Sequence, residues 1–289
     1  MGVYAVTGSA SGMGHEVVHK LSDAGHSVIG VDIRQADVVA DLSTPEGRCA
    51  AANRVLLMAG GKLDGAVLAA GLGPAPVVDR PRLIAQVNYL GVVDLLDTWR
   101  PALAAANRAK VVVFASNSTT TTPAVPKRAV RALLAHDADK AVRSVRLFGG
   151  TAPVMMYAAS KLAVSRWVRR QAVNNEWAGA GIRLNALAPG AIMTPLLEEQ
   201  LSTPRQAKAI RSFPIPIGGF GDAGQLADWV LFMLSDAADF LCGSIVFVDG
   251  GSDAYFRADD WPKPVPTHRL PAFLKRFKAT LPRPEGGSR

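Results

Sequence analysis

Short apolar runs alternate with amphipathic segments along most of the chain. The runs predict strands at Val3–Thr7, Ser27–Asp32, Val38–Asp41, Ala66–Ala70, Lys110–Ala115, Ile182–Ala188 and Ile245–Val248. Between them, apolar residues at helical spacing predict helices that include Met13–Ala24, Pro45–Ala59 and Gly224–Leu234. Apolar strands separated by helices favour a parallel sheet covered on both faces. The pattern therefore predicts an α/β, doubly wound domain over residues 1–256, with its ligand site at the carboxyl ends of the strands.

Two segments depart from this alternation. Residues 123–153 read as a helical insert, with an apolar stripe formed by Val130, Leu133, Leu134, Ala141, Val142 and Val145. Residues 257–289 form a basic, proline-rich C-terminal extension. Its prolines predict an extended path over Trp261–Pro271, followed by a short amphipathic helix within "LPAFLKRFKATLP". Leu270, Phe273, Leu274, Phe277 and Leu281 share one face of that helix, for which we expect a protein surface to be the partner.

Charge and cysteine content narrow the function classes. The net charge is +8, yet the insert carries six Lys/Arg against two Asp, and the extension carries eight against three acids. Because the remainder is nearly neutral and lacks aromatic–basic interleaving, nucleic-acid binding is not predicted. Two cysteines in separate segments predict neither a disulfide framework nor a metal site, which favours a reducing cytoplasm. We expect no signal peptide and no membrane-spanning segment.

A glycine-rich turn, "TGSASGMG", links the first predicted strand to the first helix. Gly8, Gly12 and Gly14 would allow a tight turn and let a pyrophosphate approach the free N–H groups at the helix start. The second strand ends at Asp32, whose carboxylate can accept hydrogen bonds from the adenine ribose and repels a 2′-phosphate. This favours NAD as cofactor, although Arg34 keeps NADP open as an alternative.

The stretch "MMYAASK" sets Tyr157 four residues before Lys161. On a helix such residues are neighbours, and an ammonium close to a phenol lowers the pKa of that phenol. A tyrosine tuned in this way can exchange a proton with an alcohol or a developing alkoxide near neutral pH. The pair thus predicts acid–base chemistry, if the helix lies near the cofactor site.

Taken together, the glycine spacing, the Tyr157–Lys161 pair and "APG" at residues 188–190 resemble the short-chain dehydrogenase/reductase family over roughly residues 2–256. The segments "VDIRQADVVADLSTPEGR", "AAGLGP", "LNALAPGAIMTPLL" and "FVDGG", together with the insert, resemble its 3α-hydroxysteroid dehydrogenase/carbonyl reductase branch. The resemblance implies a Rossmann fold and an NAD-dependent oxidoreductase.

The resemblance also implies the catalytic residues. Tyr157 would be the general acid/base, and Lys161 would hold the nicotinamide ribose and depress the tyrosine pKa. Ser116 would bind the substrate oxygen, with Ser118 as the alternative serine, and Asn88 would support a water-linked proton path to the lysine. One departure is Leu68–Gly71, where the missing asparagines put the internal bracing of the sheet in question. The other departure is the long stretch of sequence between Ser116 and Tyr157, which contains the insert.

Further positions correspond to the family's cofactor contacts. The resemblance places the following residues around the dinucleotide, together with Tyr157 and Lys161: Gly8, Ser11, Gly12, Met13, Gly14, Asp32, Ile33, Asp41, Leu42, Ala70, Gly71, Pro189, Gly190, Ile192 and Thr194. The family also pairs subunits through the helix that carries the tyrosine, so a homo-oligomer (dimer or tetramer) is expected, with the insert remodelling that interface or, as a second option, acting as a lid.

The substrate residues are an inference from side-chain character. Met155, Met193, Leu196 and Leu197 flank the predicted site and, with Ser116 and Tyr157, would suit an apolar alcohol or ketone such as a hydroxysteroid. Core packing is the alternative interpretation of each methionine. Two other functions remain open: a reductase of small xenobiotic carbonyls or acyl-thioesters, and a non-catalytic dinucleotide-sensing protein.

Overall fold

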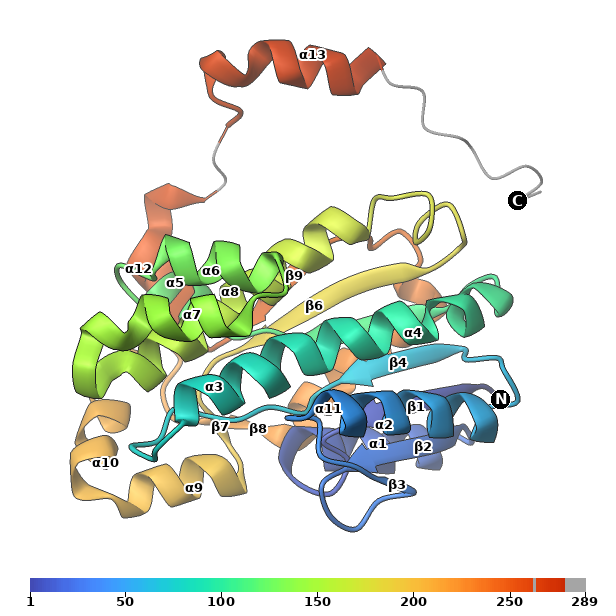
Figure 1. Cartoon of the computed structure of the whole chain (residues 1–289), viewed down its shortest axis with the longest axis horizontal. Helices are drawn as coiled ribbons and strands as arrows, with labels where there is room; N and C mark the ends of the chain where they lie inside the picture. Colours follow the sequence, from blue (N-terminus) through green and yellow to red (C-terminus); the bar gives the residue numbers. More distant parts are fainter. Residues whose placement is uncertain (262–263, 279–289) are drawn as a thin grey trace.

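A seven-stranded parallel sheet forms the centre of the protein in a computed structural model, which describes residues 1–261 and 264–278 (Figure 1). The strand order is β3-β2-β1-β4-β5-β6-β9, and every pairing is parallel. The strands are β1 (Val3–Thr7), β2 (Ser27–Asp32), β3 (Val38–Val39), β4 (Gly65–Leu68), β5 (Lys110–Phe114), β6 (Arg183–Pro189) and β9 (Ile245–Val248). The short strands β7 (Ile192–Met193) and β8 (Gly221–Asp222) pair separately. The predicted doubly wound fold is confirmed.

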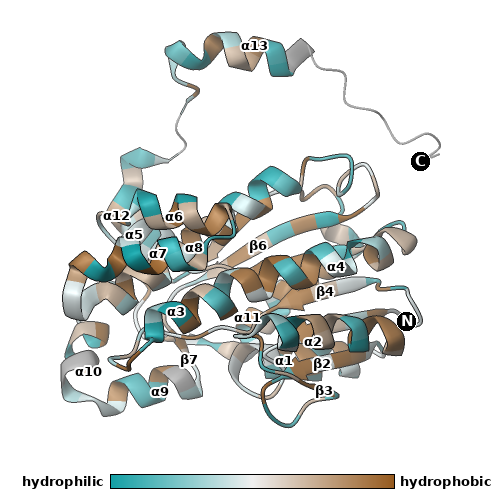
Figure 2. Ribbon diagram, viewed as in Figure 1, coloured by the Kyte–Doolittle hydropathy of each residue, from teal (hydrophilic) through white to brown (hydrophobic). Residues whose placement is uncertain are grey.

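Helices cover both faces of the sheet. On one face lie α2 (Pro45–Met58), α3 (Arg80–Ala85), α4 (Gly91–Ala105) and α8 (Ala152–Gln171), and on the other α1 (Gly12–Asp23) and α11 (Ala223–Leu234). Successive residues of β5 alternate between two buried clusters, with Val111 and Val113 on one face, and Val112 and Phe114 on the other. The apolar strands are therefore enclosed by helices, as their continuous hydrophobicity predicts (Figure 2).

The insert is helical and packs onto the body of the protein. It forms α6 (Lys127–Leu134), α7 (Ala138–Val145) and a 3₁₀ segment, η2 (Arg146–Thr151), before α8 begins. Val130, Leu133, Ala141 and Val145 of the predicted stripe are fully buried and belong to the same cluster as α8. An ion pair between Arg82 and Asp139 also joins α7 to α3. The inner face of the insert is therefore part of the core.

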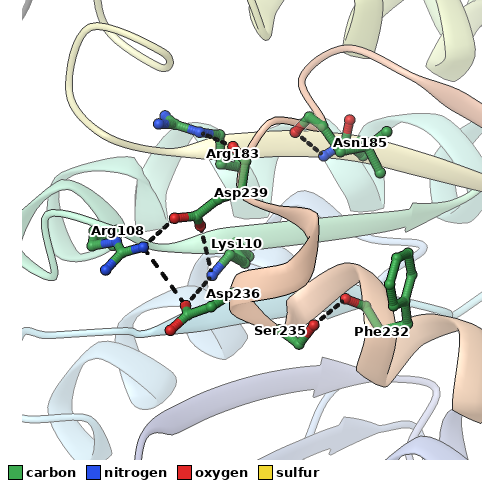
Figure 3. Close-up of polar contacts among 9 residues, drawn as sticks. Arg108, Lys110, Arg183, Asn185, Phe232, Ser235, Asp236 and Asp239 are labelled. Carbon is green, nitrogen blue, oxygen red and sulfur yellow. Dashed lines mark hydrogen bonds and ion pairs between the residues drawn. The ribbon is translucent and has the colours of Figure 1, made fainter. Parts of the chain in front are cut away.

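An ion cluster joins the amino end of β5 to the turn after α11 (Figure 3). Lys110, which is 5 % exposed, places its Nζ 3.0 Å from carboxylate oxygens of both Asp236 and Asp239. Arg108 pairs with Asp239 from the solvent side. Burial raises the pKa of Asp239, but the hydrogen bonds from Arg108 and Lys110 outweigh it and leave that pKa below its ordinary value. The cluster stabilises the end of the sheet opposite the ligand edge.

The C-terminal extension leaves the body after α12 (Ser252–Arg257) and the 3₁₀ segment η4 (Ala258–Asp260). A second 3₁₀ segment, η5 (Thr267–Arg269), precedes α13 (Leu270–Lys278), so the helix predicted from the sequence is present, with Pro271 in its first turn. Figure 1 shows α13 standing apart from the sheet and its helices. Leu270, Phe273 and Leu274 are about half exposed. Pro262 and Leu281, which the sequence prediction also used, lie outside the described residues.

None of the helices within 1–261 and 264–278 is long and apolar enough to cross a membrane. Over the same residues, no group of three or more His, Cys, Asp or Glu side chains could hold a metal ion.

Candidate active site

The glycine turn after β1 borders the main cavity of the ligand edge, which encloses about 550 Å³. That volume falls within the range of cofactor pockets. Gly8 has a φ of +71°, in the region that favours glycine, and its α-hydrogen faces the backbone of Ala70. A Cβ on Gly14 would lie 2.1 Å from the carbonyl oxygen of Gly8. Only glycine therefore lets the start of α1 approach the turn this closely, and this leaves backbone N–H groups for a pyrophosphate.

Asp32, the last residue of β2, lines this cavity. Its Oδ2 accepts a hydrogen bond from the N–H of Ala10 at 3.1 Å, and its Oδ1 accepts one from the N–H of Ile33 at 2.7 Å. The carboxylate is thus fixed between the glycine turn and the end of the strand. Arg34 is exposed and is not among the residues that line the cavity.

Most of the predicted cofactor residues border this one cavity. They are Gly8, Ser11, Gly12, Met13, Gly14, Asp32, Ile33, Asp41, Leu42, Ala70, Gly71 and Thr194. Sequence reasoning missed a second wall formed by Arg80, Leu83 and Val87. Their spacing of three and four residues is a helical signal, because it sets them on one face of a helix. Residues from six segments of the chain therefore surround a single cavity.

Tyr157 lies on α8, close enough to Ser116 for the serine side chain to lower the pKa of the phenol against the effect of burial. Ser116 follows the end of β5 and is 8 % exposed. Its Oγ accepts a hydrogen bond from the N–H of Ser118 at 3.1 Å, which orients the hydroxyl. The structure thus pairs Ser116, and not Ser118, with the tyrosine, even though the whole insert separates the two residues in sequence.

Lys161 is buried one helical turn further along α8. Its Nζ donates a hydrogen bond to the carbonyl oxygen of Phe114 at 2.7 Å and lies 5.9 Å from the centroid of the Tyr157 ring. Burial lowers the pKa of Lys161 to about 8, because it disfavours the ammonium.

The expected depression of the tyrosine pKa is not found. Burial raises the pKa of Tyr157 above its ordinary value, and the hydrogen bond from Ser116 only partly opposes this. The expectation fails because it weighed the neighbouring ammonium and neglected the desolvation of the phenolate, which dominates in a buried position. Tyr157 and Lys161 lie one turn apart on a helix, as predicted, but the pKa of Tyr157 is raised and not lowered.

Asn88 lies in a short π-helical segment, η1 (Gln86–Leu90), between α3 and α4. Such segments occur often at functional sites. Its Oδ1 accepts from the N–H of Leu72 at 2.8 Å, and its Nδ2 donates to the carbonyl of Leu72 at 3.0 Å. A Cβ placed on Gly71 would lie 3.6 Å from Asn88 Oδ1 and 3.7 Å from Lys161 Nζ, so both side chains face the same small space.

The loop around Leu68–Gly71, which lacks the asparagines usual in the family, is braced by other side chains. Thr7 Oγ1 accepts a hydrogen bond from the N–H of Ala70 at 3.1 Å, and Asn88 holds Leu72 from the other side. Side chains from β1 and η1 therefore brace this loop.

The turn after β6 carries the remaining cofactor candidates. The carbonyl of Pro189 accepts from the N–H of Asn117 at 2.9 Å, and the N–H of Gly190 donates to Val248 at 3.0 Å. Ile192 is buried in β7, and Thr194 caps α9 (Pro195–Ser202). Pro189, Gly190 and Ile192 are not among the residues that line the main cavity.

The predicted substrate residues do not share one cavity, unlike most of the predicted cofactor residues. Met193 is 39 % exposed and lines a second cavity beside His15 and Glu16. Met155 is half-buried and packs against the core, as the alternative interpretation expected. Leu197 is buried, while the side chain of Leu196 is not among those described.

A doubly wound sheet with a glycine turn at its first strand and a Ser–Tyr–Lys set beside it defines a dinucleotide-dependent oxidoreductase. A family profile described as enoyl-(acyl carrier protein) reductase matches residues 141–253. The chain is 37% identical over 257 residues to the 3-alpha-hydroxysteroid dehydrogenase/carbonyl reductase of Comamonas testosteroni, a match that covers 89% of this chain and 98% of that one. The chain belongs to the short-chain dehydrogenase/reductase family.

Solved structures agree with this assignment. The 3-alpha-hydroxysteroid dehydrogenase from Pseudomonas sp. B-0831, complexed with NADH, is 42% identical with a TM-score of 0.83, and the match covers 89% of this chain and 99% of that one. A 4-hydroxyisoleucine dehydrogenase complexed with NADH is 23% identical with a TM-score of 0.68, over 88% of this chain and 99% of that one, and shares the fold. The chain is therefore an alcohol–ketone oxidoreductase that uses a nicotinamide dinucleotide.

Proposed function

We propose that the protein uses NAD to interconvert a secondary alcohol and a ketone on a hydroxysteroid or a related carbonyl compound. The observation that carries the proposal is the placement of Tyr157 beside the buried Lys161, whose Nζ lies next to Gly71 of the dinucleotide cavity, with Ser116 interacting with the tyrosine. The position of Asp32 in that cavity supports NAD over NADP, since a carboxylate there repels a 2′-phosphate.

A bound dinucleotide supplies or accepts the hydride, and the residues of this chain handle the proton and the charge. During ketone reduction, Ser116 donates a hydrogen bond to the carbonyl oxygen and stabilises the charge that develops on it. Tyr157 gives its phenolic proton to that oxygen. Its raised pKa keeps the phenol protonated for reduction. For alcohol oxidation, the proton must return to Tyr157, which requires stabilisation of the phenolate.

Lys161 would supply that stabilisation and would also hold the nicotinamide ribose of a bound dinucleotide. The lysine and Asn88 face the same space next to Gly71, which supports a proton path between the tyrosine and solvent through Asn88. Gly8, Gly12 and Gly14 would hold the pyrophosphate at the start of α1, and Leu42 would contact the adenine.

The names of two relatives support the proposed substrate, since both are called 3-alpha-hydroxysteroid dehydrogenase. Reduction of small xenobiotic carbonyls is the alternative, which the second half of the name of the Comamonas testosteroni relative supports. We also propose a homo-oligomer in a reducing cytoplasm, consistent with the two separate free cysteines.

A substrate panel would test the proposal directly. The purified protein is assayed with NAD and with NADP on 3α- and 3β-hydroxysteroids, and with NADH and NADPH on ketosteroids and small aromatic ketones. We expect the highest kcat/KM with NAD(H) on one steroid epimer. Turnover of small ketones alone would support the alternative, and no turnover on the whole panel would contradict both.

A further inference from the structure

Arg80 is the one cation among the described residues that line the main cavity. Two carboxylic residues, Asp32 and Asp41, line the same cavity. The glycine turn at residues 7–14 contains no lysine or arginine. A dinucleotide carries negative charge on its pyrophosphate, which the two carboxylates repel. The partial positive charge at the start of α1 offsets part of this repulsion, and Arg80 is the side chain on the cavity wall that can offset more of it.

A hydrogen bond fixes the guanidinium of Arg80 at the cavity. Its Nε donates to the carbonyl oxygen of Gly73 at 2.8 Å, which closes the loop between β4 and α3. Within the part of the chain that the structure describes, no carboxylate lies within ion-pair distance of this half-buried side chain. The bond to Gly73 therefore orients the guanidinium and leaves its terminal nitrogens for a ligand.

The direction of each side chain on α3 separates two neighbouring arginines. Arg80 shares one helix face with Leu83 and Val87, and all three line the cavity. Arg82, two residues further on, forms an ion pair with Asp139 of α7 and is not among the lining residues. One arginine of this helix therefore faces the dinucleotide cavity, while the other joins the helix to the insert.

The glycine turn and Arg80 border the cavity from opposite sides. The turn leads into α1, which packs on one face of the sheet, whereas Arg80 begins α3, which packs on the other face. A ligand between them can thus be bound by backbone N–H groups from one side and by a full positive charge from the other.

We infer that Arg80 binds the pyrophosphate of the dinucleotide from the side opposite the glycine turn. A planar guanidinium presents paired N–H donors that match two phosphate oxygens. Its charge offsets the repulsion from the two carboxylates, which the backbone of the turn cannot do alone. The inference deepens the proposed function, on which it rests, by assigning a charged pyrophosphate ligand that the glycine motif does not contain.

The test measures Kd for NADH, ADP-ribose and adenosine by titration and competition, at low and at high salt. Arg80→Met keeps an aliphatic stem and removes the charge. At low salt it should raise Kd for NADH and ADP-ribose by roughly tenfold to hundredfold, the value of a charge-assisted hydrogen bond. Adenosine has no phosphate and should bind both proteins equally. High salt should narrow the NADH difference, because it screens the attraction. Arg80→Lys should recover only part of the affinity, because it keeps the charge and loses the paired donors.

Arg82→Met is the matched control, since it removes an arginine of the same helix that is paired with Asp139. It should leave all three Kd values near wild type. The inference is overturned if Arg80→Met keeps the wild-type Kd for NADH, or raises Kd for adenosine as much as that for ADP-ribose. An unchanged Kd for NADH with a raised KM for a carboxylated steroid alone would assign Arg80 to the substrate instead.

If Arg80→Met does not fold, Arg80→Lys decides the question, because it should still weaken ADP-ribose and not adenosine. The outcome is separate from that of the proposed function. A wild type whose NADH affinity depends on Arg80, but which turns over no alcohol or ketone, would contradict the proposed function and leave this inference standing.

Discussion

Lys161 Nζ lies 5.9 Å from the centroid of the Tyr157 ring, yet its hydrogen bond goes to the carbonyl of Phe114. The backbone carbonyl at the end of β5 therefore fixes the position of the ammonium beside the phenol ring. Burial lowers the pKa of Lys161 and raises the pKa of Tyr157, so each group is poised toward its neutral form. The two residues contribute in separable ways, and each can be tested alone.

Tyr157→Phe removes the proton donor and retains the ring. We expect kcat to fall by about a hundredfold to ten-thousandfold, the range for loss of a general acid or base. Because the ring still fills its place on α8, the melting temperature and the Kd for NADH should stay close to wild type. Steady-state kinetics and fluorescence titration with NADH measure these quantities. Activity near wild type would exclude Tyr157 as the proton donor.

Lys161→Met tests the buried ammonium through the pH dependence of stability. The unfolded lysine keeps its proton up to its ordinary pKa of 10.5, whereas the folded one loses it near 8. Between these values the unfolded state binds more protons, so wild-type stability should rise with pH relative to the variant. Chemical denaturation of both proteins from pH 7 to 10.5 gives the difference in unfolding free energy. A constant difference over this range would contradict a lowered pKa.

Asp32→Asn keeps the side-chain size and one of the two hydrogen-bond acceptors and removes the charge. If the carboxylate sets NAD preference, the ratio of kcat/KM for NAD over NADP should narrow by about tenfold or more, because repulsion of the 2′-phosphate is lost. Arg34→Ala serves as the control and should alter that ratio little. A wild-type preference for NADP, lost in Arg34→Ala, would assign cofactor choice to the arginine.

The outer face of the insert offers a test of subunit pairing. Deleting the insert would remove the buried Val130 and Leu133 and uncover the part of α8 against which α6 packs, so charge reversal at exposed positions is the sharper change. Arg131→Glu combined with Lys140→Glu should lower the oligomeric mass if this face is an interface, while Arg54→Glu on α2 should not. Light scattering measures the mass. An unchanged mass with an altered KM would favour the lid.

The sequence was sufficient to predict the sheet, because each strand is apolar and each is followed by helical spacing. The limits of Val3–Thr7, Ser27–Asp32 and Ile245–Val248 agree with the predicted ones, while β3 is only two residues long. A strand at the sheet edge pairs on one side only, and an apolar pattern does not reveal where that pairing stops.

The site residues that belong to a sequence motif could be predicted. The properties that depend on how the residues pack in the fold could not. The glycine turn and Asp32 line one cavity, as their spacing implies. The direction of the Tyr157 pKa could not be predicted, since burial is a property of the fold around α8. Met155 shows the same limit, because an apolar residue beside a catalytic one has the same sequence pattern whether it faces the substrate or the core.

The C-terminal helix α13 carries the last prediction. Leu270, Phe273 and Leu274 are about half exposed on it, and a helix of nine residues is marginal alone in water. We expect its apolar face to dock on the enzyme or a neighbouring subunit, because so small an apolar face gives weak membrane binding without a second anchor. A protein ending at Asp260 should therefore show a lower melting temperature or oligomeric mass. Phe273→Ser with Leu274→Ser should reproduce that loss, while Lys275→Ser, a matched change at a charged residue, should not.

Vesicles containing phosphatidylserine should bind neither the full chain nor the shortened one. Co-sedimentation of the full chain alone with these vesicles would show that α13 binds lipid.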